Sequence, residues 1–366
     1  MLNNIKIDIG LVLGFVSILF WSTAATAFKI ALVGLEVFEV LLISIFTSIV
    51  IFLVYDLFEL LKSQVNSKNE TTPNLLKTQN LSKTSTIKSN IIKKNIQKYF
   101  TYLLNPFLYY IVLFEAYSLL TAQLALTLNY LWPIILIIMM MISKREIFEN
   151  KLIFSIILSF LGFLVIISKG DINNIKIIYQ SLTDFQTANN SSSSYLFSKG
   201  VFLAIFSSFI WAFYWLIKSS KTNKRNENLS INFIISFLAL IVYLLITDIE
   251  LLANFGAKVN QILTDKTIKF NENSFLASVY IGCFEMGITF ILWLKALNST
   301  QKPIILANMV YISPFLSIFW ISLLLNESIY ITSIIGLIMI IVSIFFYNKK
   351  TYRTKNTKQT KVEIKI

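Results

Sequence analysis

The feature that most constrains this chain is its series of apolar runs, each about as long as a membrane is thick. An α-helix of about 20 apolar residues spans a bilayer core, and runs of this length recur along the 366 residues. Charged residues make up 14% of the chain, whereas soluble domains carry about 25%. The sequence therefore predicts an all-α integral membrane protein.

The apolar runs predict ten transmembrane helices. The third and fourth runs are nearly continuous, and Thr121 and Gln123 mark the expected turn between them. The expected helices cover residues 9–31, 37–61, 103–120, 122–142, 151–168, 199–218, 231–248, 274–297, 303–325 and 328–347. Three long polar segments, 62–100, 169–198 and 249–273, are expected to be loops.

The basic residues predict the side of the membrane that each loop faces. Cytoplasmic loops are enriched in Lys and Arg. With the N-terminus in the cytoplasm, the inside segments hold 24 of the 32 Lys and Arg residues and the outside segments hold five. The inside segments are then 1–8, 62–100, 143–151, 218–230, 298–302 and 348–366. We expect a multi-pass protein of the inner cell membrane with both termini in the cytoplasm.

The two halves of the chain resemble each other five helices apart. Pro133 in the fourth helix aligns with Pro314 in the ninth, and the same alignment pairs neighbouring residues. These pairs are Tyr130 with Tyr311 and Glu146 with Glu327, while Phe114-Glu115 recurs upstream as Phe284-Glu285 and Trp21 recurs as Trp211. The common order indicates an internal duplication.

Five helices is an odd number, so the second copy must enter the membrane from the opposite side. Inverted repeats allow two halves to open alternately around a substrate near the midplane. We expect a first repeat at 1–168 with a cytoplasmic insert at 62–100, an outer linker at 169–198, a second repeat at 199–347 and a basic tail at 348–366. A duplicated bundle without transport activity is the alternative.

Several stretches resemble the drug/metabolite transporter superfamily, EamA type. They are LFWSTAATAFKIAL (19–32), NYLWP (129–133), FIWAFYWLIK (209–218), FEMGITFILWLKAL (284–297) and the segment 311–336. NYLWP and the FIWA stretch are most similar to the branch that contains the aromatic-amino-acid exporter YddG. The resemblance implies ten helices, a central cavity and the export of small metabolites.

Glu115 and Glu285 are the sharpest candidates for chemistry. An ionisable residue inside a membrane usually faces the interior of the bundle and has a function. On helices that border a central cavity, either carboxylate could bind substrate or carry a coupling proton. The alternative is a protonated acid that braces two helices, and the sequence does not decide between these roles.

Other polar and aromatic residues lie beside the two prolines. Asn129 and Asn308 could bind a polar group of the substrate, or could only join helices, as amides do in lipid. Pro133 and Pro314 remove a helical hydrogen bond and allow a kink, so we treat them as hinge candidates. Among the aromatic residues of these helices, Trp21, Tyr130 and Trp211 are the candidates for substrate stacking, and Tyr311 is a further candidate for substrate binding or coupling. Lys29, near a helix end, is expected to extend toward the membrane surface.

The sequence also excludes several classes of protein. It has no histidine, one cysteine and no Gly-x-x-x-x-Gly-Lys-[Ser/Thr] loop, so no metal, cofactor or ATP-driven mechanism is predicted. The basic residues that give the net charge of +13 lie between and after the apolar runs. This distribution argues against a nucleic-acid partner. We predict a secondary transporter, an exporter of small organic metabolites such as amino acids, and not an enzyme. A membrane-embedded lipid-modifying enzyme and a non-transporting scaffold or sensor are the alternatives, and the oligomeric state is open.

The charge pattern makes a prediction that cysteine labelling can test. Cysteines introduced at Ser192 and Asn260 should react with an impermeant thiol reagent in intact cells. Cysteines at Ser82 and Thr222 should not, because these positions lie in the basic, cytoplasmic segments. Labelling of Ser82→Cys from outside would overturn the orientation and require a different number of helices.

Overall fold

The computed structural model describes residues 8–67, 100–144, 150–173, 176, 193–219, 228–264, 272–300, 306, 309–343 and 345. Most of the insert 62–100 and of the linker 169–198, the whole tail 348–366, and the residues Glu146 and Asn308 lie outside this description. The predictions made for them stay predictions.

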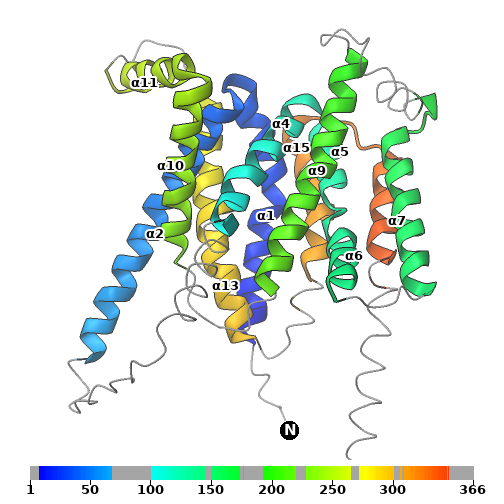
Figure 1. The fold of residues 1–366 in the computed structure, drawn as a ribbon, viewed down its shortest axis with the longest axis horizontal. Coiled ribbons are helices and arrows are strands. Elements are labelled where there is room, and N and C mark those ends of the chain that lie inside the picture. Colours follow the sequence, from blue (N-terminus) through cyan, green and yellow to red (C-terminus); the bar gives the residue numbers. More distant parts are fainter. Residues whose placement is uncertain are drawn as a thin grey trace, which may run out of the picture.

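The first half of the chain is a series of helices, with residues 68–99 outside the description (Figure 1). Its elements are α1 (Ile9–Gly34), α2 (Val37–Ser67), the π-helical stretch η1 (Leu103–Leu108), α4 (Tyr109–Leu119), α5 (Ala122–Asn129), α6 (Trp132–Lys144) and α7 (Asn150–Ser168). The predicted turn near Thr121 is present, because α4 ends at Leu119 and α5 begins at Ala122.

The second half repeats this arrangement with one additional helix. Its elements are α9 (Ser193–Ser219), α10 (Leu229–Thr247), α11 (Ile249–Thr264), α12 (Glu272–Tyr280), the π-helical stretch η2 (Ile281–Ile288), α13 (Thr289–Ser299), the short 3₁₀ helix η3 (Val310–Ile312), α15 (Ser313–Leu325) and a last helix, Ile331–Ser343. In Figure 1, α1 runs upward from its first residue, whereas α9 runs downward.

Six helical stretches of the described residues are long and apolar enough to cross a membrane. They are Ile9–Gly34, Val37–Gln64, Ala122–Ser143, Tyr195–Ile217, Leu229–Thr247 and Glu272–Ser299, and three shorter apolar helices accompany them. The all-helical membrane class is confirmed. Each of the ten predicted ranges overlaps a helix, but the number of ten crossings stays a prediction.

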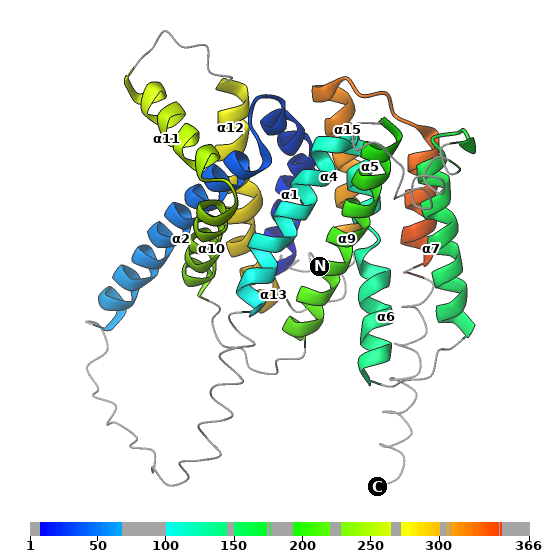
Figure 2. The same ribbon diagram turned by 45° about the horizontal axis from the view of Figure 1, so that its top comes forward.

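The first helix of each half packs against the other half. Helix α1 lies against α12, α13 and α15, whereas α9 lies against α4, α5 and α6. The exchange is reciprocal, and the last helices of the two halves, α7 and Ile331–Ser343, lie side by side at one edge of the bundle (Figure 2). Most of the core contacts are therefore made between the halves.

Small residues allow helices from the two halves to approach closely, as is usual within membranes. A Cβ atom added to Gly336 of the last helix would lie 2.5 Å from the carbonyl oxygen of Gly162 in α7. The hydroxyl groups of Ser159 and Ser343 form a hydrogen bond of 2.5 Å in the same interface. This contact joins the last helix of the first half to the last helix of the second.

Helix α11 was not predicted from the sequence. Residues 249–273 were expected to form a loop, but α11 occupies Ile249–Thr264 and crosses one end of the bundle (Figure 1). Leu251 is buried, and Leu252 and Phe255 pack against the core. The apolar residues at spacings of three and four were the signal for an amphipathic helix. The segment is too polar to cross a membrane, so the search for apolar runs missed it.

The close contact at Gly336 predicts that a single methyl group added there lowers the stability of the protein. Gly336→Ala places its Cβ against a backbone oxygen, so the two helices must separate; overpacking of this kind costs about 1–3 kcal/mol. We expect a lower melting temperature for the purified protein in detergent. Gly256→Ala is the matched control, because a Cβ there meets nothing within 4 Å. An unchanged melting temperature for Gly336→Ala would contradict the close packing.

Candidate functional site

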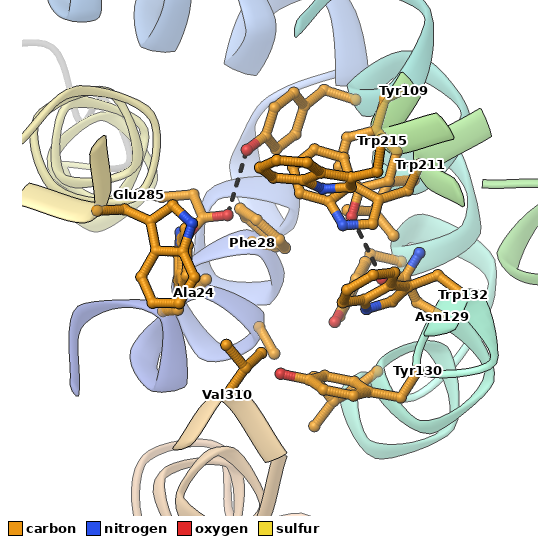
Figure 3. A pocket seen from close by; sticks show the side chains of 17 residues that line it. Ala24, Phe28, Tyr109, Asn129, Tyr130, Trp132, Trp211, Trp215, Glu285 and Val310 are labelled. Atoms are coloured by element: carbon orange, nitrogen blue, oxygen red, sulfur yellow. Dashed lines mark hydrogen bonds between the residues drawn. The ribbon is translucent and has the colours of Figure 1, made fainter. Parts of the chain in front are cut away.

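A cavity of about 120 Å³ lies in the centre of the bundle, between the two halves (Figure 3). Ten of its 17 lining residues are aromatic, and α1, α4, α5, α6, α9, η2, α13 and η3 all contribute to its wall. The lining residues are Trp21, Ala24, Ala25, Phe28, Tyr109, Tyr110, Leu113, Tyr117, Leu126, Asn129, Tyr130, Trp132, Trp211, Trp215, Glu285, Trp293 and Val310. A cavity of about 150 Å³ holds a benzene molecule, so this cavity has room for a ligand of about one ring.

Glu285 is the charged residue of the cavity wall. Its Oε1 accepts a hydrogen bond of 3.2 Å from the hydroxyl group of Tyr110, and its Oε2 is buried with no hydrogen-bond partner among the described residues. Figure 3 shows the carboxylate directed into the cavity. A buried carboxylate oxygen without a partner is costly, so it marks a position where a ligand or a proton can bind.

The π-helical stretch η2 positions Glu285. Gly282 lets this stretch approach α2, since a Cβ added there would lie 2.4 Å from the carbonyl oxygen of Ser44. Ser48 donates a hydrogen bond of 2.9 Å to the carbonyl oxygen of Gly282. π-Helical turns contain an extra residue and occur frequently at functional sites. The wider turn rotates Glu285 relative to the helix that precedes it.

Asn129 lies on the opposite wall of the cavity from Glu285 (Figure 3). Its Oδ1 accepts a hydrogen bond of 3.2 Å from the hydroxyl group of Tyr109, and its Nδ2 donates one of 2.7 Å to Ser207 of α9. Trp211 packs on Tyr109 with ring centroids 4.6 Å apart. The amide therefore joins three helices, which was one of the two alternatives, and it also lines the cavity, while its binding of a substrate stays a prediction.

Pro133 and Pro314 each begin a new helix. Pro133 is the second residue of α6, after the break at Tyr130 and Leu131, and Pro314 is the second residue of α15, after η3. Proline suits the first turn of a helix because its missing N–H would have no partner there. Neither proline can donate to the carbonyl group four residues earlier, which belongs to Asn129 or Val310. Both of these residues line the cavity.

The structure brings together five of the predicted site residues and leaves two outside. Trp21, Asn129, Tyr130, Trp211 and Glu285 line the cavity. Tyr311 is not among the lining residues and packs on Phe345, with ring centroids 5.4 Å apart.

Glu115 does not border the cavity, contrary to the sequence expectation. Its carboxylate forms a 2.9 Å ion pair with Lys199, and both side chains are more than a third exposed. Unlike Glu285, it lies in a regular α-helix, α4, so its side chain leaves the helix on a different face. The Phe-Glu pair that the two repeats share therefore predicts how far along its helix each Glu lies. It does not predict the face of the helix from which the Glu side chain projects.

Sequence reasoning did not select seven of the ten aromatic lining residues. Tyr109, Tyr110, Tyr117, Trp132, Trp215 and Trp293 line the cavity together with Phe28. The signal was the density of aromatic residues on the helices that carry the repeat, but Trp and Tyr also gather at membrane surfaces. Only the packing of the helices distinguishes the two locations.

Glu327 connects the two halves at one end of the bundle. We call this end, where α4 ends and α5 begins, the Glu327 end; it is the upper end in Figure 1. Asn326 ends α15 in the left-handed conformation, with φ of 53°. Glu327 then accepts hydrogen bonds from the backbone N–H groups of Ala122 (2.9 Å) and Gln123 (3.3 Å). Its role is capping, and the capped helix is α5 of the other half.

Lys29 strengthens the same end of the bundle. Its Nζ donates to the carbonyl oxygens of Tyr117 (2.8 Å) and Leu120 (2.7 Å) at the end of α4. A cation at a helix C-terminus and an anion at a helix N-terminus both interact favourably with the helix dipole. Lys29 therefore caps α4 instead of extending to the membrane surface, and the turn between α4 and α5 is fixed from both sides.

Comparison with known proteins identifies the architecture. The family model described as "EamA-like transporter family" matches the chain twice, over residues 8–168 and 198–349. A solved structure titled "Crystal structure of protein" aligns with a TM-score of 0.50 and 14% sequence identity, over 94% of this chain and 98% of that chain. At this identity the likeness concerns the fold alone. No curated protein matches the chain. The double match confirms the two-repeat architecture.

The cap on α5 predicts a measurable contribution to stability. Glu327→Ala leaves the N–H groups of Ala122 and Gln123 without their acceptor, and loss of a helix cap costs about 1 kcal/mol. We expect a lower melting temperature, with a smaller loss for Glu327→Gln, which keeps one acceptor oxygen. Glu115→Ala, which removes an exposed ion pair, is the control and should change stability less. Equal stability of Glu327→Ala and the parent protein would show that the cap contributes nothing.

Proposed function

The chain belongs to the EamA-like transporter family, and we propose that it is a secondary transporter whose substrate binds in the central aromatic cavity. Membership of this family makes it a multi-pass membrane protein and a small-molecule transporter. The observation that carries the proposal is the position of the cavity, which is walled by both halves of an exchanged pair of repeats. Substrate sites of repeat transporters lie near the midplane at such an interface.

The proposed mechanism is alternating access. In this structure the Glu327 end is held together by Lys29 and Glu327, which cap α4 and α5. Lys29 and α4 belong to the same half, so movement of one half against the other would break the hydrogen bonds of Glu327 and open that end. The breaks before Pro133 and Pro314 supply matching flexible points, one in each half, beside the cavity. We propose export across the inner membrane, with both termini cytoplasmic, on the charge pattern and the family resemblance.

Glu285 is the proposed coupling residue. It is the carboxyl group of the described lining, and its Oε2, which has no hydrogen-bond partner among the described residues, can receive a proton or a ligand. A carboxyl group that faces first one side of the membrane and then the other can release its proton on the second side. Asn129, Trp21, Tyr130 and Trp211 are proposed to hold the substrate. Glu115 is left out of this mechanism because it pairs with Lys199 outside the cavity.

The proposed role of Glu285 predicts a separation of two activities in proteoliposomes. Glu285→Gln should abolish accumulation driven by a pH gradient and spare downhill exchange, because the amide keeps the size of the side chain but cannot release a proton. Substrates should be found by a screen of a metabolite mixture, with uptake measured by mass spectrometry.

Glu115→Gln is the matched control, since it makes the same chemical change on the related helix outside the cavity. It should transport like the parent protein. If Glu285→Gln keeps pH-driven accumulation, or if the parent protein ignores the pH gradient, the coupling proposal fails. A parent protein that moves no metabolite at all would contradict the transport proposal itself.

A further inference from the structure

We infer that the substrate is a small organic cation, with its positive group beside Glu285 and a flat apolar body of about one ring among the tryptophans. The inference rests on the proposed function and names the substrate class of the same cavity. Three features of the described residues carry it: the charge of the wall, the direction of its hydrogen bonds and the aromatic surface.

The first feature is a carboxyl group whose negative charge, in the ionised form, has no positive partner in the described wall. Glu285 is the single charged residue in the described lining of the cavity, which includes neither Lys nor Arg. Its Oε1 has one neutral partner, Tyr110, and its Oε2 has none among the described residues. Ion pairs inside a protein are favourable when both partners are present and costly when one is missing. A cationic ligand supplies the missing partner.

The second feature is that the polar donors nearest to Glu285 and Asn129 are already engaged. The hydroxyl groups of Tyr109 and Tyr110 donate to Asn129 and Glu285, and the amide of Asn129 donates to Ser207. Pro133 withdraws the usual donor from the carbonyl group of Asn129, a residue of the cavity wall, and Oε2 of Glu285 has no donor among the described residues. These groups suit a ligand that donates hydrogen bonds.

The third feature is the aromatic surface around the carboxylate. Trp21 and Trp293 pack with ring centroids 5.1 Å apart next to Glu285, and Trp211 packs against both Tyr214 and Trp215. The face of an aromatic ring attracts cations, most strongly for Trp and in the absence of water. The indole N–H groups are neutral donors, so they cannot balance the charge of a carboxylate on the ligand.

These features set an order of affinity. An anion would be repelled by Glu285, and the described lining has no positive side chain to offset this repulsion. The negative group of a zwitterion would be repelled in the same way. A neutral molecule would fill the space but leave Oε2 unpaired. The volume of about 120 Å³ selects ligands close to one ring in size.

A binding experiment with four probes of matched size tests the inference. Benzylamine, phenylglycine, benzoate and benzyl alcohol carry a positive charge, both charges, a negative charge and no charge at neutral pH. Binding to the purified full-length protein can be followed by intrinsic fluorescence, since five of the six tryptophans line the cavity. Trp320 is the sixth, and Trp320→Phe should keep the signal.

We expect benzylamine to bind at least about tenfold more tightly than the other three probes, because it alone pairs with Glu285 without a second charge. Glu285→Gln should remove this preference, Glu285→Asp should keep part of it, and Glu115→Gln should keep all of it. Tighter binding of phenylglycine, benzoate or benzyl alcohol overturns the inference, as does benzylamine binding no tighter than millimolar or a preference that survives in Glu285→Gln.

A flux measurement separates this inference from the proposed function. Proteoliposomes should take up 1-methylpyridinium, a one-ring permanent cation that does not cross lipid unaided, and should not take up trigonelline, the same ring with a carboxylate. Uptake of trigonelline but not of 1-methylpyridinium would keep the transport proposal and overturn the cation inference. Uptake of neither, together with no uptake in the metabolite screen, would overturn both.

Discussion

The absence of water inside a membrane is the constraint on which this structure depends. Backbone groups that leave the regular helical pattern there must lie within the protein or beside a cavity. The irregular stretches of the described helices obey this rule. The break before Pro133, η3 before Pro314, and η2 contribute residues to the central cavity, whereas η1, with its non-helical Asn105, is buried within the protein. Three of these irregular stretches therefore meet at the cavity, where the two halves join.

The exchange of first helices explains how two halves can form one bundle and still move. Helix α1 belongs to the first half by sequence but packs on α12, α13 and α15, and α9 makes the reciprocal contacts. The Gly162–Gly336 contact joins the halves at one edge, and Glu327 joins them at one end. The first is a packing of backbone against backbone, whereas the second is a pair of hydrogen bonds that can be exchanged for water. We infer that the edge stays closed while the end opens.

Much of this arrangement could be predicted from the sequence, because helix length and apolar content are local properties. The paired prolines, Asn129, Trp21 and Glu285 were found from the repeat. Glu115 was placed wrongly because an aligned pair gives no information about rotation, and the π-helical turn at Glu285 changes the face that the side chain occupies. Helix α11 was missed because its pattern is amphipathic and not continuous. The cap of α5 by Glu327 could not be predicted, since the partners are more than 200 residues apart.

The central claim is that the cavity opens to the two sides of the membrane in turn, and distances between spin labels test it most directly. One pair of labels, at Ile172 and Ile249, reports on the Glu327 end, and another, at Ile142 and Ile231, reports on the opposite end; each pair joins one half to the other, and all four side chains are exposed. Both pairs should be measured in lipid over a range of pH, on labelled protein shown to transport. The account predicts that each pair of labels shows two distances. Conditions that lengthen the distance at one end should shorten the distance at the other end. Single, fixed distances in a transporting sample, or two pairs that lengthen together, would contradict it.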